Sequence, residues 1–370
     1  MAKTNNPHAV HEPLIQVSKR KEMEWYKSWF VRFVAIFAAL VICGFVTNFL
    51  TGLSPIKVYA EMIDGNFGTE RRFWIMLKEL AMLLCVSLAV TPAFKMRFWN
   101  IGAEGQSLAG ALACSACMIY LGDKLPQAVL IPVMLIASVI VGLIWAVVPA
   151  YFKAKFNTNE TLFTLMMNYI AMQLVSFCIV FWENPKNSNT VGIINADSMA
   201  GWLPPVGGQK YALCVIAVAV LTVAMYIYLM YSKQGYEISV VGESQNTARY
   251  VGINVKKVIL RTMAISGALC GVAGFLMVSG VDHTITTTTI GGLGFTAIMV
   301  SWLAKFNPVV MILTSFLIVF LECGAGQIAT AFDLNHSVAD ILTGIILFFI
   351  IGSEFFVNYQ IKFHKKHKEA

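Results

Sequence analysis

Charged residues are scarce in this chain of 370 residues. Lys, Arg, Asp and Glu make up 13% of the sequence, whereas 58% is hydrophobic and the mean hydropathy is +0.70. A soluble domain carries roughly 25% charged residues, so the composition excludes an ordinary water-soluble protein. Because backbone groups in lipid must be hydrogen-bonded within the chain, we predict an all-α polytopic membrane protein.

Motifs for nucleotide binding and hydrolysis are absent as well. The sequence has no G-x-x-x-x-G-K-[ST] loop for ATP phosphates, no G-x-S-x-G turn and no H-E-x-x-H helix. All eight cysteines fall in apolar stretches, which argues against a disulfide framework. The formal charge of +7 is scattered over loops rather than clustered. We therefore expect no enzymatic activity, no cofactor, no metal site and no nucleic acid polymer as partner, and we assign the positive charge to contact with membrane lipid.

Ten apolar stretches are present, and about 20 residues are needed to cross a bilayer. They run over residues 29–50, 73–93, 101–122, 128–152, 162–182, 211–231, 258–280, 290–304, 309–327 and 338–357. With both ends in the cytoplasm, 20 of the 27 Lys and Arg residues fall in inside segments and six outside, as the positive-inside rule requires. We predict about ten transmembrane helices in the plasma membrane, with a cytoplasmic arm (1–28), a transmembrane domain (29–358) and a basic cytoplasmic tail (359–370).

A polar motif interrupts the apolar pattern at residues 98–110, where the second and third stretches meet. Asn100 is placed to cap the third helix, and Glu104 then lies at the positive end of that helix dipole. A buried carboxylate is costly in a membrane, so two explanations remain open. The polar residues either tie helices together or shape a solute pathway.

A second polar motif covers residues 157–170, with Glu160 at a predicted helix start and Asn168 in mid-span. The Asn168 amide must hydrogen-bond a neighbouring helix or a solute. In span two, Lys78 and Glu79 are adjacent and point about 100° apart on a helix, so we expect each to find another partner. The Gly267-x-x-x-Gly271 pair in span seven predicts a close helix packing face.

The cytoplasmic loop 232–257 is too long for a simple connection between helices. Residues 242–252 within it are predicted to form one short helix, capped by Ser244 and ended by Gly252. A further feature is a weak internal echo, because Ile-Gly-Ala-Glu-Gly at 101–105 is similar to Ile-Gly-Gly-Leu-Gly at 290–294. The two copies lie five spans apart, which makes an inverted repeat possible.

These motifs resemble, in the same order, those of the inner-membrane permease subunits of ABC importers. The matching elements are residues 100–106, 159–170, 242–252 together with span seven, and 294–308. The resemblance places the chain in the superfamily of branched-chain amino acid and simple sugar permeases. It is most similar to the nucleoside branch, which works with basic membrane lipoproteins, because the first motif lacks an aspartate-led form.

The resemblance implies that the chain supplies half of the translocation pathway for a nucleoside-like solute. Its expected partners are ATP-binding subunits, a second permease chain that is a different paralogue, and an extracytoplasmic solute-binding lipoprotein. A simple sugar or riboflavin is the alternative solute. An ion-coupled secondary transporter is the alternative mechanism, and it would require ionisable residues near mid-membrane, for which Glu322 and Asp340 are candidates.

The resemblance also implies two sets of functional residues. Those expected at the solute pathway or its gate are Asn100, Glu104, Gln106, Glu160, Asn168, Thr289 and Thr296. Those expected to couple to the ATPase are Gly242, Glu243, Ser244, Asn246, Ala248, Arg249, Tyr250 and Gly252.

Overall fold

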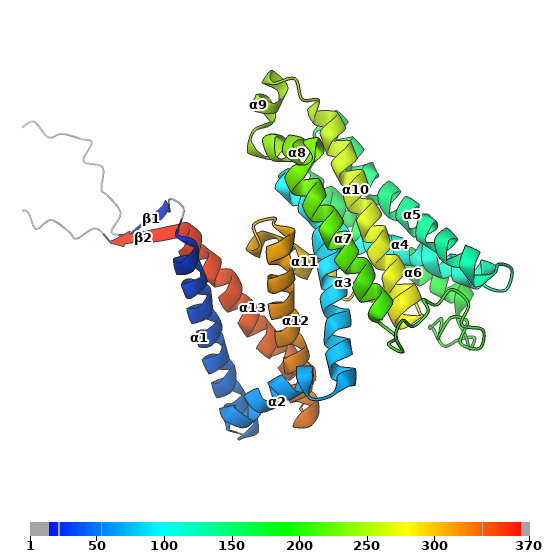
Figure 1. Ribbon diagram of the computed structural model, residues 1–370, viewed down its shortest axis with the longest axis horizontal. Helices are drawn as coiled ribbons and strands as arrows, with labels where there is room; N and C mark the ends of the chain where they lie inside the picture. The colour runs from blue at the N-terminus through cyan, green and yellow to red at the C-terminus, as the bar shows by residue number, and fades with distance from the viewer. Residues whose placement is uncertain (1–14, 21–22, 53, 335, 364–370) are drawn as a thin grey trace, which may run out of the picture. The chain divides into compact units, whose positions relative to one another are not determined.

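The structure is a computed structural model that describes residues 15–20, 23–52, 54–334 and 336–363. Helices dominate it, and the chain divides into two compact units (Figure 1). Unit 1 comprises Met1–Ile63 with Gly324–Ala370, and unit 2 comprises Asp64–Cys323. Part of the predicted arm (1–14 and 21–22) and the end of the predicted tail (364–370) lie outside the described residues.

Unit 1 is built on helices α1 (Trp25–Thr51) and α13 (His336–Asn358), which pack against each other. An ion pair between Arg32 and Glu354 joins the two helices. Arg32 Nη2 lies 2.5 Å from Glu354 Oε1, and Arg32 Nε donates to the same oxygen at 2.9 Å. Such a half-buried, forked contact fixes the register of the two helices as well as their charge balance.

Short segments of the arm and the tail form a two-stranded antiparallel sheet, a small addition to the all-α fold that the composition predicts. Strand β1 (Ile15–Lys19) pairs with β2 (Tyr359–Phe363), and Ile15 lies opposite Phe363. The physical reason is tertiary: α1 and α13 pack side by side, so the segments flanking them meet. Helix α2 (Pro55–Phe67), which the apolar pattern did not predict, follows α1. It crosses the boundary into unit 2.

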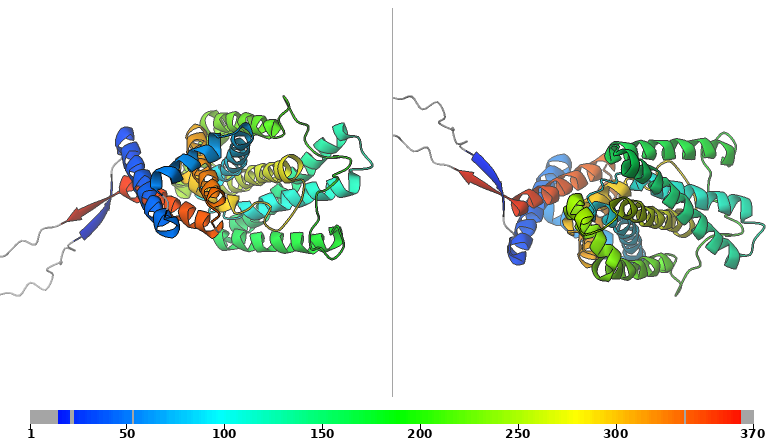
Figure 2. Two further views of the ribbon diagram at one scale, coloured as in Figure 1. Left: turned by 90° about the horizontal axis from the view of Figure 1, so that it is seen from below. Right: turned by 90° about the horizontal axis from the view of Figure 1, so that it is seen from above.

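Unit 2 is a helical bundle with a small helical subdomain at one end (Figures 1 and 2). Its elements are α3 (Glu70–Lys95), α4 (Ala103–Leu121), α5 (Gln127–Phe156), α6 (Glu160–Trp182), α7 (Ala212–Tyr231), α8 (Lys233–Glu243), α9 (Gln245–Tyr250), α10 (Val255–Phe275), the π-helical η1 (Leu276–Asp282), α11 (Leu293–Leu303) and the first part of α12 (Pro308–Ala331). Helix α10 lies at the centre and contacts α3, α4 and α5.

Glycine allows α10 to approach its neighbours this closely. A Cβ added at Gly271 would lie 2.2 Å from the carbonyl oxygen of Ser138 on α5, and one at Gly110 on α4 would lie 2.7 Å from the Gly271 Cα. Gly267 is equally crowded, because its Cβ would lie 2.4 Å from the Gly142 carbonyl oxygen. These contacts confirm the predicted packing face, since no side chain fits between the backbones.

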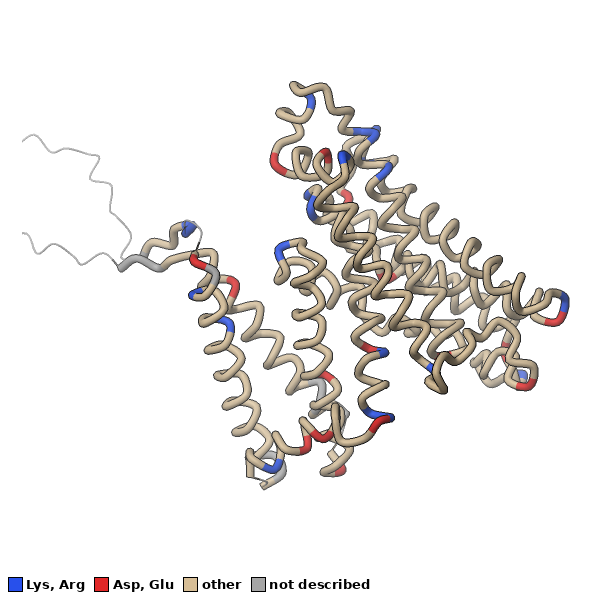
Figure 3. The backbone as a smooth tube through the Cα atoms, in the orientation of Figure 1, with Lys and Arg blue, Asp and Glu red and all other residues tan. Residues whose placement is uncertain are grey.

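Each of the ten predicted apolar stretches is largely helical, and eight helices among the described residues are long and apolar enough to cross a membrane. Helix α4 is not among the eight, because its first turns carry the polar motif, and α11 is an apolar helix of only 11 residues. Charged residues are sparse along the middle of the unit 2 helices (Figure 3). The chain is therefore a multi-pass membrane protein, and the count of ten spans stays a prediction.

One prediction about a charged pair in α3 is wrong. Lys78 and Glu79 were expected to find separate partners, but Lys78 Nζ lies 2.5 Å from Glu79 Oε1. The four-carbon lysine stem is long enough to bend around the helix and close the pair. Lys78 also lies 5.8 Å from the centre of the Tyr211 ring, so the ammonium group has an aromatic neighbour as well.

Candidate functional site: a junction of two helix starts

Two helices begin against each other inside unit 2. The Glu104 carboxylate, in the first turn of α4, accepts a hydrogen bond from Gly292 N at 2.8 Å and another from Gly294 N at 2.9 Å. Gly292 and Gly294 form the N-terminal end of α11. One buried carboxylate thus lies at the positive ends of two helix dipoles, which stabilises its negative charge.

The junction joins the two segments of the internal echo, residues 101–105 and 290–294. Glycine is required on both sides of it. A Cβ at Gly294 would lie 2.6 Å from Glu104 N, and a Cβ at Gly105 would lie 2.7 Å from the Cα of Asn168. The glycines of the two motifs therefore allow the backbones of neighbouring helices to approach closely, in addition to interrupting the helices.

Asn100 and Gln106 form a reciprocal amide pair beside this junction. Gln106 Nε2 donates to Asn100 Oδ1 at 2.9 Å, and Asn100 Nδ2 donates to Gln106 Oε1 at 3.2 Å and to Ser266 Oγ of α10 at 3.3 Å. The predicted cap is wrong, because Gly102 occupies the capping position of α4. Asn100 Oδ1 instead accepts from Gly102 N at 3.1 Å and closes the turn before the helix.

Helix α6 is fastened to the same place. Asn168 Oδ1 accepts from Gly105 N at 2.9 Å, and Asn168 Nδ2 donates to Ile101 O at 2.9 Å. Thr164, one helical turn earlier, accepts from Ile101 N at 3.2 Å. The sequence analysis missed Thr164 and Ser266. The signal for Thr164 was available, since it lies four residues before Asn168 on the same helix face.

The junction is closed to solvent in this conformation. Asn100 is fully buried, and Glu104, Gln106 and Asn168 are 5%, 1% and 2% exposed. Their hydrogen bonds link α4, α6, α10 and α11. Of the two explanations offered by the sequence, the one in which these side chains tie helices together describes the geometry seen here.

The other predicted pathway residues are Glu160, Thr289 and Thr296. Glu160 begins α6 and forms an ion pair with Lys153 of α5 at 2.9 Å. The Thr289 hydroxyl accepts from Thr286 N at 2.7 Å and closes a turn in the segment before α11. Thr296 lies at the end of the first turn of α11 and is partly buried. The predicted pathway residues therefore have different structural roles.

The predicted coupling segment consists of two helices rather than one. Gly242 and Glu243 finish α8, and Ser244 has an extended backbone between α8 and α9. Ser244 Oγ accepts from Thr247 N at 3.2 Å, which confirms its capping role. Gly252, with φ of +81°, lies two residues past α9 in the left-handed region that favours glycine.

The two faces of α9 differ. Ala248 is fully buried in a cluster with Met96, Val258 and other apolar residues, so its side chain packs against the bundle. Tyr250 is 92% exposed, and Arg249, also exposed, donates to Asn246 Oδ1 at 3.1 Å. Ala248 holds α9 on the bundle while the opposite face presents an aromatic ring, an amide and a guanidinium group.

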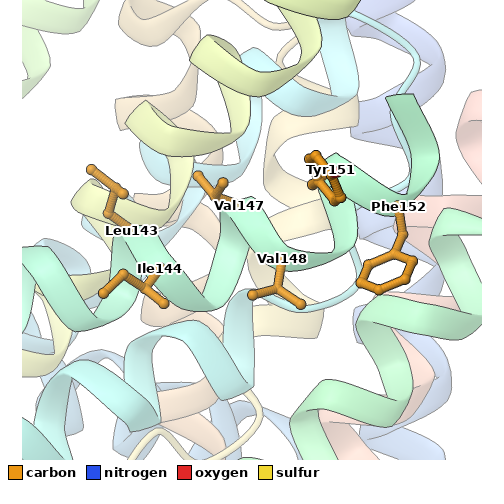
Figure 4. Close-up of a pocket in the computed structure, with 6 residues that line it drawn as sticks. All are labelled: Leu143, Ile144, Val147, Val148, Tyr151 and Phe152. Carbon is orange, nitrogen blue, oxygen red and sulfur yellow. The ribbon is translucent and has the colours of Figure 1, made fainter. Parts of the chain in front are cut away.

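An apolar groove on α5 can be excluded as a site for a polar solute. It has a volume of about 300 Å³ and is shown in Figure 4. Its lining residues are Leu143, Ile144, Val147, Val148, Tyr151 and Phe152. The Tyr151 hydroxyl is its one polar side-chain group, and that hydroxyl already accepts from Lys155 Nζ at 3.0 Å. Such a surface suits hydrocarbon chains.

Comparison with known proteins identifies relatives across most of the chain. Residues 75–351 match the family described as branched-chain amino acid transport system / permease component. The glucose ABC transporter permease protein TsgB13 of Haloferax volcanii is 27% identical over 94% of this chain and 93% of its own length. The guanosine ABC transporter permease protein NupP of Bacillus subtilis is 28% identical, with 90% and 94% covered. The probable riboflavin import permease protein RfuC of Treponema pallidum is 21% identical, with 86% and 82% covered.

Proposed function

The chain belongs to the family of branched-chain amino acid transport system permease components, and we propose that it forms half of an import pathway for a nucleoside. At the coarser level it is a permease of an ABC transporter and a multi-pass membrane protein. The chain has no P-loop, so ATP hydrolysis is assigned to separate subunits. A second permease chain and an extracytoplasmic binding lipoprotein complete the proposed importer.

The observation that carries the transport proposal is the junction of α4 and α11. Helix starts that meet inside an apolar bundle are typical of transporter pathways, because broken helices expose backbone dipoles where a solute passes. Glu104 holds this junction closed through Gly292 and Gly294. We propose that the junction is a gate, which opens when these two hydrogen bonds are exchanged for others.

Nucleosides are the favoured solute because four of the relatives are named for guanosine or nucleosides, and two of these cover 90% and 83% of this chain. Relatives named for glucose and riboflavin keep those solutes as alternatives. A direct test is thermal melting of the binding protein encoded beside this chain, with nucleosides, pentoses and flavins added in turn. Stabilisation by a pentose or flavin alone would contradict the nucleoside assignment.

We assign docking of the ATPase to the exposed face of α9. Tyr250 is the natural anchor, since buried aromatic residues dominate interface energies, and Arg249 supplies charge. Gly242 secures the adjacent end of α8, because a Cβ there would lie 2.2 Å from the Lys95 carbonyl oxygen. A movement of α9 would thus be transmitted through α8 to α3. Co-purification of the ATPase with permease variants tests this assignment.

The import mechanism is tested in proteoliposomes that contain the complete complex. Uptake that requires ATP and binding protein supports the proposal. Uptake driven by an ion gradient without ATPase subunits would favour secondary transport instead. The Asp340 side chain, one candidate for ion coupling, lies outside the described side chains.

A further inference from the structure

The exposed side of α6 carries polar residues among its apolar ones. In their middle turns α5 and α7 expose apolar side chains, such as Ile140 and Val220, as expected for contact with lipid. Helix α6, at one edge of the bundle (Figure 2), instead exposes Tyr169, Gln173 and Ser176 among its apolar residues. These three are spaced i, i+4, i+7 and so form one stripe along the helix.

The stripe is poorly suited to hydrocarbon. Gln173 lies near the middle of a 23-residue helix, and its amide has no hydrogen-bond partner within the part of the chain that the structure describes. An amide that faces lipid without a partner is strongly disfavoured, because no water replaces the missing bonds. The Gln173 amide therefore requires water or a polar partner beside it, although apolar residues such as Ile170 and Phe177 are exposed on the same helix.

Contacts on the other sides of α6 show which helices the stripe does not face. Asn168 turns toward α4, and Met167 O accepts from Trp145 Nε1 of α5 at 3.2 Å, so the stripe points away from α5. On α4, Glu104 contacts α11 and the adjacent Gly105 contacts α6. Helices α6 and α11 thus contact α4 at two adjacent residues of its first turn.

We propose that Tyr169, Gln173 and Ser176 form a wall of the solute pathway and recognise the base and sugar of a nucleoside. This inference rests on the proposed function. A Gln amide offers one donor and one acceptor in the arrangement that matches the edge of a nucleobase. An aromatic ring provides a stacking surface for any base, and the serine hydroxyl suits a sugar hydroxyl. The stripe carries no charge, which fits a neutral solute.

The reactivity of an introduced thiol tests whether the Tyr169, Gln173 and Ser176 stripe faces water, independently of any transport measurement. Gln173→Cys, in the assembled importer, should react with a water-soluble, membrane-impermeant thiol reagent well above the background of the unsubstituted chain. Val220→Cys on α7 is the matched control and should not react, because thiols in lipid do not ionise. An unreactive position 173 would overturn the inference. Reactivity only in the absence of the second permease would assign the stripe to the subunit interface and overturn it too.

Uptake of labelled guanosine tests recognition of the base. Gln173→Leu should lower uptake about tenfold, the effect of one lost hydrogen-bonded pair, while the ATPase still co-purifies. Tyr169→Phe should retain uptake and Tyr169→Leu should lower it, because the ring supplies the contact. Full uptake by Gln173→Leu would overturn this inference and leave the nucleoside assignment intact. A complex that imports only glucose or riboflavin would overturn the nucleoside assignment as well, even with position 173 reactive.

Discussion

Glu104→Gln is the substitution that tests the α4–α11 junction most directly. It keeps the shape of the side chain and removes its charge. The carboxylate accepts two backbone hydrogen bonds, from Gly292 N and Gly294 N, whereas an amide has one oxygen and one NH₂ group. In the variant, one glycine N–H would therefore face another donor in a buried site.

The size of the effect follows from these contacts. A hydrogen bond to a charged group contributes about 1.5–3 kcal/mol, and a buried donor left unsatisfied costs about 1–3 kcal/mol. The favourable position of the charge at the helix ends adds up to ~2 kcal/mol. We expect the junction to be weakened by about 2–4 kcal/mol, since these contributions overlap, which changes a closed-to-open equilibrium roughly 30- to 700-fold.

Uptake in proteoliposomes and thermal melting of the purified complex are the assays. Glu104→Gln should lower uptake tenfold or more and lower the melting temperature, with normal abundance in the membrane. Glu70→Gln is the matched control, because Glu70 is also in the first turn of its helix but is exposed. Unchanged uptake and melting for Glu104→Gln would refute the reasoning. Failure of the variant to assemble would reduce Glu104 to a structural residue.

Three further predictions concern other parts of the chain. Tyr250→Ala should reduce co-purification of the ATPase at least tenfold while Tyr250→Phe does not, and equal recovery with both variants would place docking elsewhere. Gly271→Ala should destabilise the protein by about 1–3 kcal/mol or more in thermal melting, whereas Gly344→Ala, with no atom within 4 Å, should be neutral. In intact cells Ser188→Cys should be labelled from outside and Lys366→Cys protected, and the reverse pattern would invert the predicted topology.

Much of the helical architecture was predictable from residue type. Long apolar stretches predicted the membrane helices to within a few residues at most ends, because the bilayer sets their length and composition. The predictions that failed involve relations between neighbours. Asn100 was predicted to cap a helix, and Lys78 and Glu79 were predicted to have separate partners. Each of these contacts depends on the direction of the backbone or on side-chain packing, which a local sequence pattern does not contain.

By itself, the sequence determined that this is a multi-pass membrane protein of the permease family, because composition and motif order are local properties. Only the tertiary structure decided what the polar motifs contact. Glu104 caps a helix 188 residues further along the chain, and Asn168 binds Gly105 of α4, 63 residues earlier. It also separated the buried Asn168 from the exposed Gln173 on one helix. Both are amides in an apolar stretch, and the position of α4 alone makes them different.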